Sequence, residues 1–313
     1  MTEPQFILAV DAGGTRTKMG LVNRSTGALL HVAVHPSPFS GTDEFLALLS
    51  QTASALLSQA QAGWNAITAI GIGLPGYVDG NFISQVWESM AYMEGDQFRP
   101  TLEQAFHLPV LIENDARAIA LAEYHYGGGC QPERLLSLTL GTGIGFGFIL
   151  NGSFHEKKPL AHMAPHILIR PGAEPCYCGL NGCLESLVNG RHLLSEFQRR
   201  RQPDTEPDLA DSKEILHEAA MQAATARAGS AFSAVQELLQ DLITGLNIFI
   251  YTYAPDEIVL GGGVAQGLAE FLPQIQQGLI AQPYRGFHSQ VRISALGEKA
   301  GLLGAAALFK NPA

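Results

Sequence analysis

The sequence predicts an α/β protein, because short apolar runs typical of strands alternate along the chain with longer segments of helical periodicity. A strand, a glycine turn and a second strand, followed by helices, occur at the start of each half. This pattern indicates a weak internal duplication of one α/β unit and not a solenoid repeat. The 313 residues, 46% of them hydrophobic, suffice for one large domain or two ordinary ones with sizeable cores.

The first half opens with two apolar runs joined by a glycine turn, which predicts a pair of strands. Residues 42–60 carry apolar side chains at helical spacing, with Thr42 or Asp43 available as the helix cap. The predicted strands cover residues 5–10, 18–22, 28–34, 67–73 and 110–112, and the predicted helices cover 42–60, 102–106 and 116–126.

The second half follows three glycines at residues 127–129. Its predicted strands cover residues 135–140, 146–150 and 257–260, and its predicted helices cover 189–200, 212–252, the segment after 263, and 302–309. Residues 155–185 are expected to be irregular, and the polar segment 202–211, rich in Pro and Asp, is expected to be a linker.

Composition excludes several classes of partner. The 19 Lys and Arg residues against 29 Asp and Glu give a formal net charge of −10, which does not favour binding to nucleic acid or to an anionic membrane. No apolar run approaches the roughly 20 residues that span a bilayer, and the N-terminus does not resemble a signal peptide. Four cysteines are too few for a disulfide framework. We therefore expect a cytoplasmic protein that binds neither nucleic acid nor membrane.

Asp11 ends the first predicted strand and is followed by a turn that contains Gly13, Gly14 and Thr15. Glycines let backbone amides approach phosphate oxygens, Thr15 adds a hydroxyl, and the Asp11 carboxylate can hold hydrated Mg²⁺. The turn therefore suits a polyphosphate. An ordinary hairpin with glycine in its turn would explain the same residues.

Two further glycine turns occur in the second half. One lies between two apolar runs, and it is neither a Walker-type loop nor a dinucleotide fingerprint. The other follows a strand and opens a helix, where a phosphate or a flat heterocycle can lie against bare backbone. Both are also explained as packing turns. The turn between the two apolar runs contains Gly141, Thr142 and Gly143. The turn that opens a helix contains Gly261, Gly262 and Gly263.

Asn114 and Asp115 follow the predicted strand 110–112. Open α/β sheets bind ligands at the carboxyl ends of their strands. A carboxylate there can accept the proton of a substrate hydroxyl, and a neighbouring Asn can orient that hydroxyl. The alternative is that both residues only cap the following helix.

Three cysteines lie within eight residues. Cys176, Cys178 and Cys183 are placed on a glycine-rich loop, with His166 ten residues upstream. Three thiolates and one imidazole would complete a tetrahedral zinc site of structural type, without an open position for catalysis. Buried, inert cysteines are the alternative. Two further histidines, His155 and His162, compete for the fourth position. The remaining cysteine, Cys130, is interpreted as a packing residue.

In this order, these pieces resemble the ROK family of sugar kinases and sugar-responsive repressors. The most specific piece is Cys176-x-Cys178-Gly-x-x-Gly-Cys183-x-Glu185. The resemblance covers nearly the whole chain and implies the actin-like ATPase fold, with two ribonuclease-H-like domains around a nucleotide and sugar cleft. The implied domains are residues 1–117, joined by the helix at 301–313, and residues 118–300, which carry the zinc loop.

The resemblance also implies roles for single residues. Asp115 matches the catalytic base, and Asn114 matches its sugar-binding neighbour. Glu185 matches a glutamate that contacts sugar hydroxyls, and His166 matches a zinc ligand beside the substrate. Asp11 matches the aspartate associated with phosphate and Mg²⁺, and ATP would lie on the three glycine turns.

The chain departs from the family pattern at two places near the expected sugar site. Met163 stands where the family usually has a glutamate that contacts the sugar, and a thioether is at best a weak acceptor. The segment 87–92 lacks the asparagine with which many members grip the sugar. Phe146, where many members have Gly, is a milder change.

The resemblance therefore implies an ATP-dependent kinase of a hexose or hexose derivative, with Mg²⁺ and Zn²⁺ as cofactors. Its partners would be a small-molecule sugar and a nucleotide, and a homodimer is the assembly frequent in the family. The alternative is a non-catalytic, regulatory ROK protein whose sugar site is degenerate at Met163. A zinc-dependent hydrolase is excluded, because three Cys and one His leave no position for water.

Overall fold

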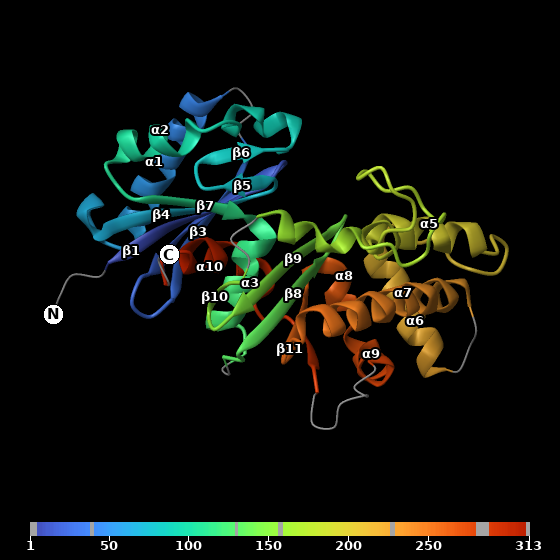
Figure 1. The fold of residues 1–313 in the computed structure, drawn as a ribbon. Coiled ribbons are helices and arrows are strands. Elements are labelled where there is room, and N and C mark those ends of the chain that lie inside the picture. The colour runs from blue at the N-terminus through green and yellow to red at the C-terminus, as the bar shows by residue number, and fades with distance from the viewer. Residues whose placement is uncertain are drawn as a thin grey trace. The chain divides into compact units, whose positions relative to one another are not determined.

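The computed structural model describes residues 5–37, 41–128, 131–155, 159–225, 229–279 and 288–310. Cys130 and Gly129 lie outside these residues. The chain forms two compact units (Figure 1). Unit 1 comprises Met1–Gln131, Gly152–Ala161 and Leu296–Ala313, and unit 2 comprises Pro132–Asn151 and His162–Ala295.

Unit 1 contains a five-stranded mixed sheet in the order β3-β2-β1-β4-β7. The pairs β1–β2 and β2–β3 are antiparallel, whereas β1–β4 and β4–β7 are parallel. The strands are β1 (Phe6–Ala12), β2 (Arg16–Asn23), β3 (Leu29–Pro36), β4 (Ile67–Leu74) and β7 (Val110–Asn114), and a small hairpin consists of β5 (Tyr77–Asp79) and β6 (Phe82–Ser84).

Helices cover both faces of this sheet, which explains why β1 is apolar at nearly every position. Alternate β1 residues such as Leu8 and Val10 belong to a core shared with two helices, and Ile7 and Ala9 belong to a core on the other face. The first pair of helices is α1 (Thr42–Gln59) and α2 (Phe98–Phe106), and the second is α3 (Asp115–Tyr126) and α10 (Ala300–Ala307).

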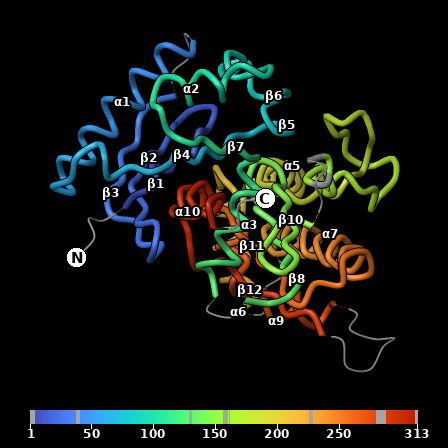
Figure 2. Tube along the Cα trace, turned by 60° about the vertical axis from the view of Figure 1, so that its left-hand side comes forward, coloured from blue at the N-terminus to red at the C-terminus, as the bar shows by residue number. Residues whose placement is uncertain are grey.

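Helix α10 lies directly against β4 and α3, although it follows both of them by well over a hundred residues in sequence (Figure 2). A Cβ atom at Gly71 of β4 would overlap the carbonyl oxygen of Ala305. A Cβ atom at Gly304 would lie 2.5 Å from the carbonyl oxygen of Ala118. Backbone therefore packs on backbone, and only glycine permits this approach.

The second five-stranded sheet has the order β10-β9-β8-β11-β12, which repeats the connectivity of the first. Its strands are β8 (Arg134–Leu140), β9 (Ile144–Leu150), β10 (Ser153–Phe154), β11 (Glu257–Gly261) and β12 (Gln290–Ile293). The helices of unit 2 are α4 (Leu184–Leu187), α5 (Gly190–Arg200), α6 (Ser212–Ala224), α7 (Ser230–Tyr253), α8 (Gly262–Gly267) and α9 (Leu272–Gly278). Helices α5 to α7 supply most of the helical side chains in its core.

The α/β class is confirmed, and the predicted elements differ from the observed ones mainly at their ends. Helix α2 begins at Phe98, four residues before the predicted start, and α10 begins at Ala300. The hairpin β5–β6 and the edge strand β12 were not predicted, because segments of three or four residues carry too little periodicity. Within the described ranges, no helix is both long and apolar enough to cross a membrane.

The close contact between β4 and α10 yields a stability prediction. Gly71→Ala should lower the free energy of unfolding by about 3 kcal/mol, because the new methyl group meets rigid backbone. Gly73→Ala in the same strand is the matched control. Its Cβ atom would make only ordinary contacts of 3.6 Å or longer, so its effect should stay within about 1 kcal/mol. Urea denaturation of both variants is the measurement, and equal effects would contradict the prediction.

Candidate active site and metal centre

Asp11 and Asp115 lie at the carboxyl edge of the unit 1 sheet, on either side of Gly73. The parallel pairing of β1 and β4 sets Asp11 opposite Gly73. On the other side, β7 pairs Glu113 with Gly73, and Asp115 begins α3 just beyond this strand. A Cβ atom at Gly73 would lie only 3.6 Å from the Cα atom of Asp115. The structure therefore brings the two predicted carboxylates to one edge with bare backbone between them.

Burial raises the pKa of Asp11 from 3.8 to about 6. The negative charge of Asp115 adds to the increase, and the ammonium group of Lys18 partly opposes it. Lys18 is itself engaged with Glu298, whose Oε2 atom lies 2.6 Å from Nζ. A Cβ atom at Gly301, in the first turn of α10, would lie 2.5 Å from the Asp11 carboxylate. The Asp11 carboxylate is thus enclosed, and Lys18 compensates its negative charge only in part.

Asn114 is the N-cap of α3. Its Oδ1 atom accepts hydrogen bonds from the amides of Ala116 (3.1 Å) and Arg117 (3.2 Å), and Nδ2 donates to the carbonyl of Gly76 at 3.0 Å. The capping alternative is therefore realised for this residue. The side-chain amide has two hydrogens and Gly76 takes one, so the second is the group that can serve a ligand.

Asp115 is held by its place at the start of α3. Its Oδ1 atom accepts a hydrogen bond from the Ala116 amide at 2.8 Å, which lowers the pKa of the carboxyl. Burial has the larger effect and raises that pKa above its usual value. A carboxyl group with a raised pKa is a stronger base once ionised, which suits proton abstraction from a hydroxyl.

A buried ion pair next to Asp115 was not predicted from the sequence. Arg117 Nε lies 3.0 Å from Glu113 Oε1, and the guanidinium stands 4.2 Å from the centre of the Phe154 ring. Both charged side chains are largely buried. The sequence shows Glu113 and Arg117 four residues apart. Pairs of opposite charge at this spacing usually lie on the exposed face of a helix, so the sequence did not indicate a buried pair.

The turn at Gly13–Thr15 is partly committed to its own hairpin. The Gly13 amide donates to the Arg16 carbonyl at 3.1 Å, and the Ser37 hydroxyl donates to the Gly13 carbonyl. The Ser37 amide also donates to the Thr15 carbonyl at 3.1 Å. Ser37 thus braces the turn, a role that no sequence motif indicated. The Gly13 amide therefore points into the hairpin.

The two glycine turns of unit 2 lie side by side. Strands β8 and β11 are paired, and Gly262 has φ +87°, a conformation that favours glycine. A Cβ atom at Gly262 would overlap the backbone of Leu140, directly before the Gly141 turn. The Gly190 amide donates to the Gly141 carbonyl at 2.9 Å. The structure therefore unites Gly141–Gly143 and Gly261–Gly263 into one surface of bare backbone.

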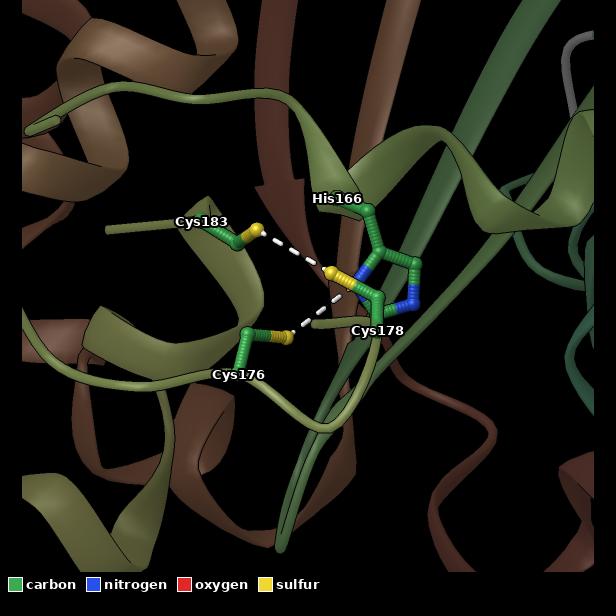
Figure 3. Close-up of side chains that lie close together, drawn as sticks. All are labelled: His166, Cys176, Cys178 and Cys183. Atoms are coloured by element: carbon green, nitrogen blue, oxygen red, sulfur yellow. Dashed lines mark hydrogen bonds between the residues drawn. The ribbon is translucent and has the colours of Figure 1, made fainter. Parts of the chain in front are cut away.

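His166, Cys176, Cys178 and Cys183 form one cluster in unit 2 (Figure 3). Their four ligand atoms all lie within 4.8 Å of one another. His166 Nδ1 is 3.3 Å from Cys176 Sγ, and the sulfur atoms of Cys178 and Cys183 are 3.5 Å apart. Zinc bonds of roughly 2.0–2.3 Å in a tetrahedron give ligand separations of roughly 3.6–3.8 Å. The donor set and its spacing therefore fit zinc.

His155 and His162 are described residues, and neither belongs to this cluster. His166 is thus the histidine that the structure brings to the cysteines. Burial lowers its pKa, and the positive charge that His162 can carry lowers it further. A lowered pKa favours the neutral imidazole, which is the form that binds a metal.

The loop that carries the cysteines is fixed at Gly182, whose φ of +91° favours glycine. A Cβ atom there would overlap the carbonyl of Arg170. Arg170 in turn makes 2.6 Å ion pairs with Glu237 and Asp241 of α7. The second glycine of the Gly-x-x-Gly segment is therefore required by close packing against the preceding chain.

Glu185 faces Nε2 of His166, the ring nitrogen that points away from the cysteines. Its Oε2 atom lies 3.3 Å from His166 Nε2, and the Tyr177 hydroxyl lies 3.0 Å from that nitrogen. Burial raises the pKa of Glu185 to about 7, although hydrogen bonds from the Ile144 amide and Tyr177 oppose the increase. A metal bound by Nδ1 would leave the proton on Nε2, which could then donate a hydrogen bond toward Glu185 or Tyr177. Tyr177 was not predicted, because the family signature leaves its position open.

The pKa of Asp11 yields a prediction for stability against pH, measured without nucleotide or magnesium. Because the folded value of about 6 exceeds the value of 3.8 for a free carboxyl, ionisation destabilises the folded chain. This cost is absent below pH 4 and complete above pH 6, and it amounts to about 3 kcal/mol. Asp11→Asn should therefore gain about that much stability relative to the wild type between pH 4 and pH 7. A difference that stays constant with pH would refute the assignment, and Asp204→Asn in an exposed loop is the control.

Comparison with known proteins supports one assignment. The family model described as "ROK family" matches residues 7–312. A glucokinase of Streptomyces coelicolor is 30% identical, with 97% of this chain and 98% of the relative covered. An N-acetylmannosamine kinase of Shigella flexneri is 29% identical, again covering 97% and 98%.

The solved structures agree. A ROK family glucokinase from Streptomyces griseus, in complex with glucose and AMPPNP, superimposes with a TM-score of 0.73 at 26% identity, covering 97% of this chain and 98% of that chain. The expected actin-like ATPase fold is confirmed by such neighbours. The match over nearly every residue leaves one conclusion, that the chain belongs to the ROK family.

Proposed function

We propose that this protein is an ATP-dependent kinase that transfers a phosphoryl group to a hydroxyl of a hexose or hexose derivative. The observation that carries the proposal is the pair of partly buried carboxylates, Asp11 and Asp115, at the sheet edge of a ROK family chain. Its similarity to a glucokinase and an N-acetylmannosamine kinase over nearly their full lengths supports the same reaction.

Asp115 is the proposed general base. Phosphoryl transfer proceeds through a loose transition state, so the enzyme mainly positions the reactants and stabilises charge. The raised pKa of Asp115 equips it to take the proton of the attacking hydroxyl, and the α3 cap at Asn114 fixes its position. The free hydrogen of the Asn114 amide is proposed to bind the sugar beside the base.

Asp11 is the proposed residue for magnesium. Its carboxylate is enclosed by α10 and has a raised pKa, which means that a nearby cation would stabilise its ionised form. Magnesium, when bound with ATP, neutralises charge on the phosphates. Gly14 and Thr15 are the proposed phosphate contacts of unit 1. The turns at Gly141–Gly143 and Gly261–Gly263 are the proposed nucleotide contacts of unit 2.

Zinc is proposed to bind His166, Cys176, Cys178 and Cys183 as a structural ion. It would cross-link the loop and hold the His166 ring with Nε2 toward Glu185. His166 and Glu185 are the proposed sugar contacts of unit 2. Met163, which precedes His166 in the 3₁₀ helix Pro159–His166, cannot replace a carboxylate as acceptor. We therefore propose a substrate that differs from glucose at the hydroxyl concerned, or carries an apolar substituent.

A regulatory protein that binds sugar without phosphorylating it is the second candidate, and Met163 is the observation in its favour. Retention of Asp115, Asp11 and the glycine turns favours the enzyme. The discriminating experiment is a coupled assay for ADP release with glucose, mannose, N-acetylglucosamine and N-acetylmannosamine. ADP release that depends on one of these sugars supports the kinase. Saturable sugar binding without ADP release would support the regulatory protein.

Asp115→Asn should keep the fold and reduce turnover of the best sugar by about 10²–10⁴-fold, because the amide cannot accept the proton. Steady-state kinetics measure the loss, and circular dichroism checks the fold. Asp204→Asn removes an exposed carboxylate and should retain wild-type turnover. Wild-type activity in Asp115→Asn would exclude the residue as base.

The purified protein should contain one zinc per chain, and Cys178→Ser should lower both the zinc content and the thermal stability. Elemental analysis after dialysis against a weak chelator is the measurement. Cys130→Ser removes the remaining cysteine of the sequence and should leave the zinc content unchanged. An intact, zinc-free wild type would contradict the proposal.

A further inference from the structure

Trp87 is a large aromatic side chain left mostly uncovered at the edge of the unit 1 site. It directly precedes the 3₁₀ helix Glu88–Met93, and 60% of its surface is exposed. Its indole packs on Gly14 of the predicted phosphate turn, where a Cβ atom would lie 3.1 Å from Trp87 Cδ1. The absence of a side chain at Gly14 therefore makes room for this ring.

The backbone around Trp87 is fixed on both sides. The Met90 amide donates to the Trp87 carbonyl at 2.7 Å, and the Ser89 hydroxyl donates to the Gly14 carbonyl at 3.4 Å. On the other side, Val86 packs against Gly76, whose carbonyl accepts the hydrogen bond from Asn114 Nδ2. Trp87 is thus connected to the phosphate turn and to the neighbour of the proposed base.

Packing on Gly14 alone does not explain why the Trp87 indole is so exposed. A residue that only covered Gly14 would bury its apolar surface there, whereas Trp87 leaves most of its indole to solvent. A tryptophan ring offers a broad apolar face with negative charge density, which attracts C–H groups. Binding sites combine such apolar walls with a few polar groups that fix orientation. Asn114 and Asp115 supply the polar groups in unit 1.

We infer that Trp87 is a substrate-contact residue whose indole stacks on the apolar C–H face of the sugar. The inference rests on the proposed function and extends it to a specificity determinant. The segment 87–92 contains no asparagine, and Trp87 provides an apolar contact beside the polar groups of Asn114 and Asp115. It selects sugars with an unobstructed C–H face and is indifferent to the nucleotide.

The sequence offers a direct probe, because Trp64 and Trp87 are its two tryptophans. Trp64 stacks on Phe106 with ring centres 6.2 Å apart, outside the proposed site. Trp64→Phe therefore leaves Trp87 as the single indole fluorophore and should keep wild-type turnover. Titration of this variant with each of the four sugars should give a saturable change in tryptophan emission for the sugars that bind. The matched variant Trp87→Phe, which retains Trp64, should give no such change.

Kinetics provide the second readout. Trp87→Ala should raise the KM for the sugar roughly tenfold and change kcat less than about twofold, because stacking acts on bound sugar before and during transfer. Trp87→Phe keeps an aromatic face and should restore KM to within about threefold of the wild type. The KM for ATP should not change in either variant.

Two results would overturn the inference. One is an unchanged Trp87 emission at saturating concentrations of a sugar that the same variant phosphorylates. The other is a saturable change produced by AMPPNP alone and not by any sugar, which would assign the ring to the nucleotide. Failure of the proposed function has a different outcome: no sugar supports ADP release. In that case a sugar-dependent change in Trp87 emission would still support the contact, in a protein that binds sugar without phosphorylating it.

Discussion

The close approach of α10 to the unit 1 sheet is the constraint on which the candidate active site depends. Gly71 and Gly304 let the helix backbone touch β4 and α3, and Gly301 lets its first turn reach the Asp11 carboxylate. The same contact encloses Asp11 and so raises its pKa. A larger residue at any of these glycines would move the helix and reopen the wall behind the carboxylate.

The cluster of metal ligands in unit 2 also depends on a close approach at a glycine. His166 ends the 3₁₀ helix Pro159–His166, and the three cysteines lie on the loop that follows. The geometry of that loop depends on the packing of Gly182 against Arg170 and on the ion pairs of Arg170 with α7. His166 presents Nδ1 to the thiols and Nε2 to Glu185. One side chain thereby joins the proposed zinc site to the proposed sugar contact, so the two cannot be altered independently.

Much of this arrangement could be predicted from the sequence, because its signals are local. The apolar β1 segment, the cysteine spacing and the glycine turns each lie within a few residues. The roles of Ser37, Tyr177 and Trp87 could not be predicted, because each depends on a partner that only the fold brings near. Asn114 is intermediate, since its sequence context allowed both a helix cap and a ligand contact, and the structure shows the cap.

The position of α10 also determines the order in which the chain can be completed during synthesis. Unit 2 consists largely of residues 162–295, which emerge before α10. The sheet of unit 1 emerges first, yet one of its faces is covered only in part, by α3, until Ala300–Ala307 have left the ribosome. At roughly 5–20 residues per second, the N-terminal sheet must wait on the order of ten seconds or more with apolar β1 and β4 surface uncovered. The proposed catalytic carboxylates belong to the first half of the chain, yet their surroundings are completed last. During that interval the exposed apolar surface of the N-terminal sheet is prone to aggregation.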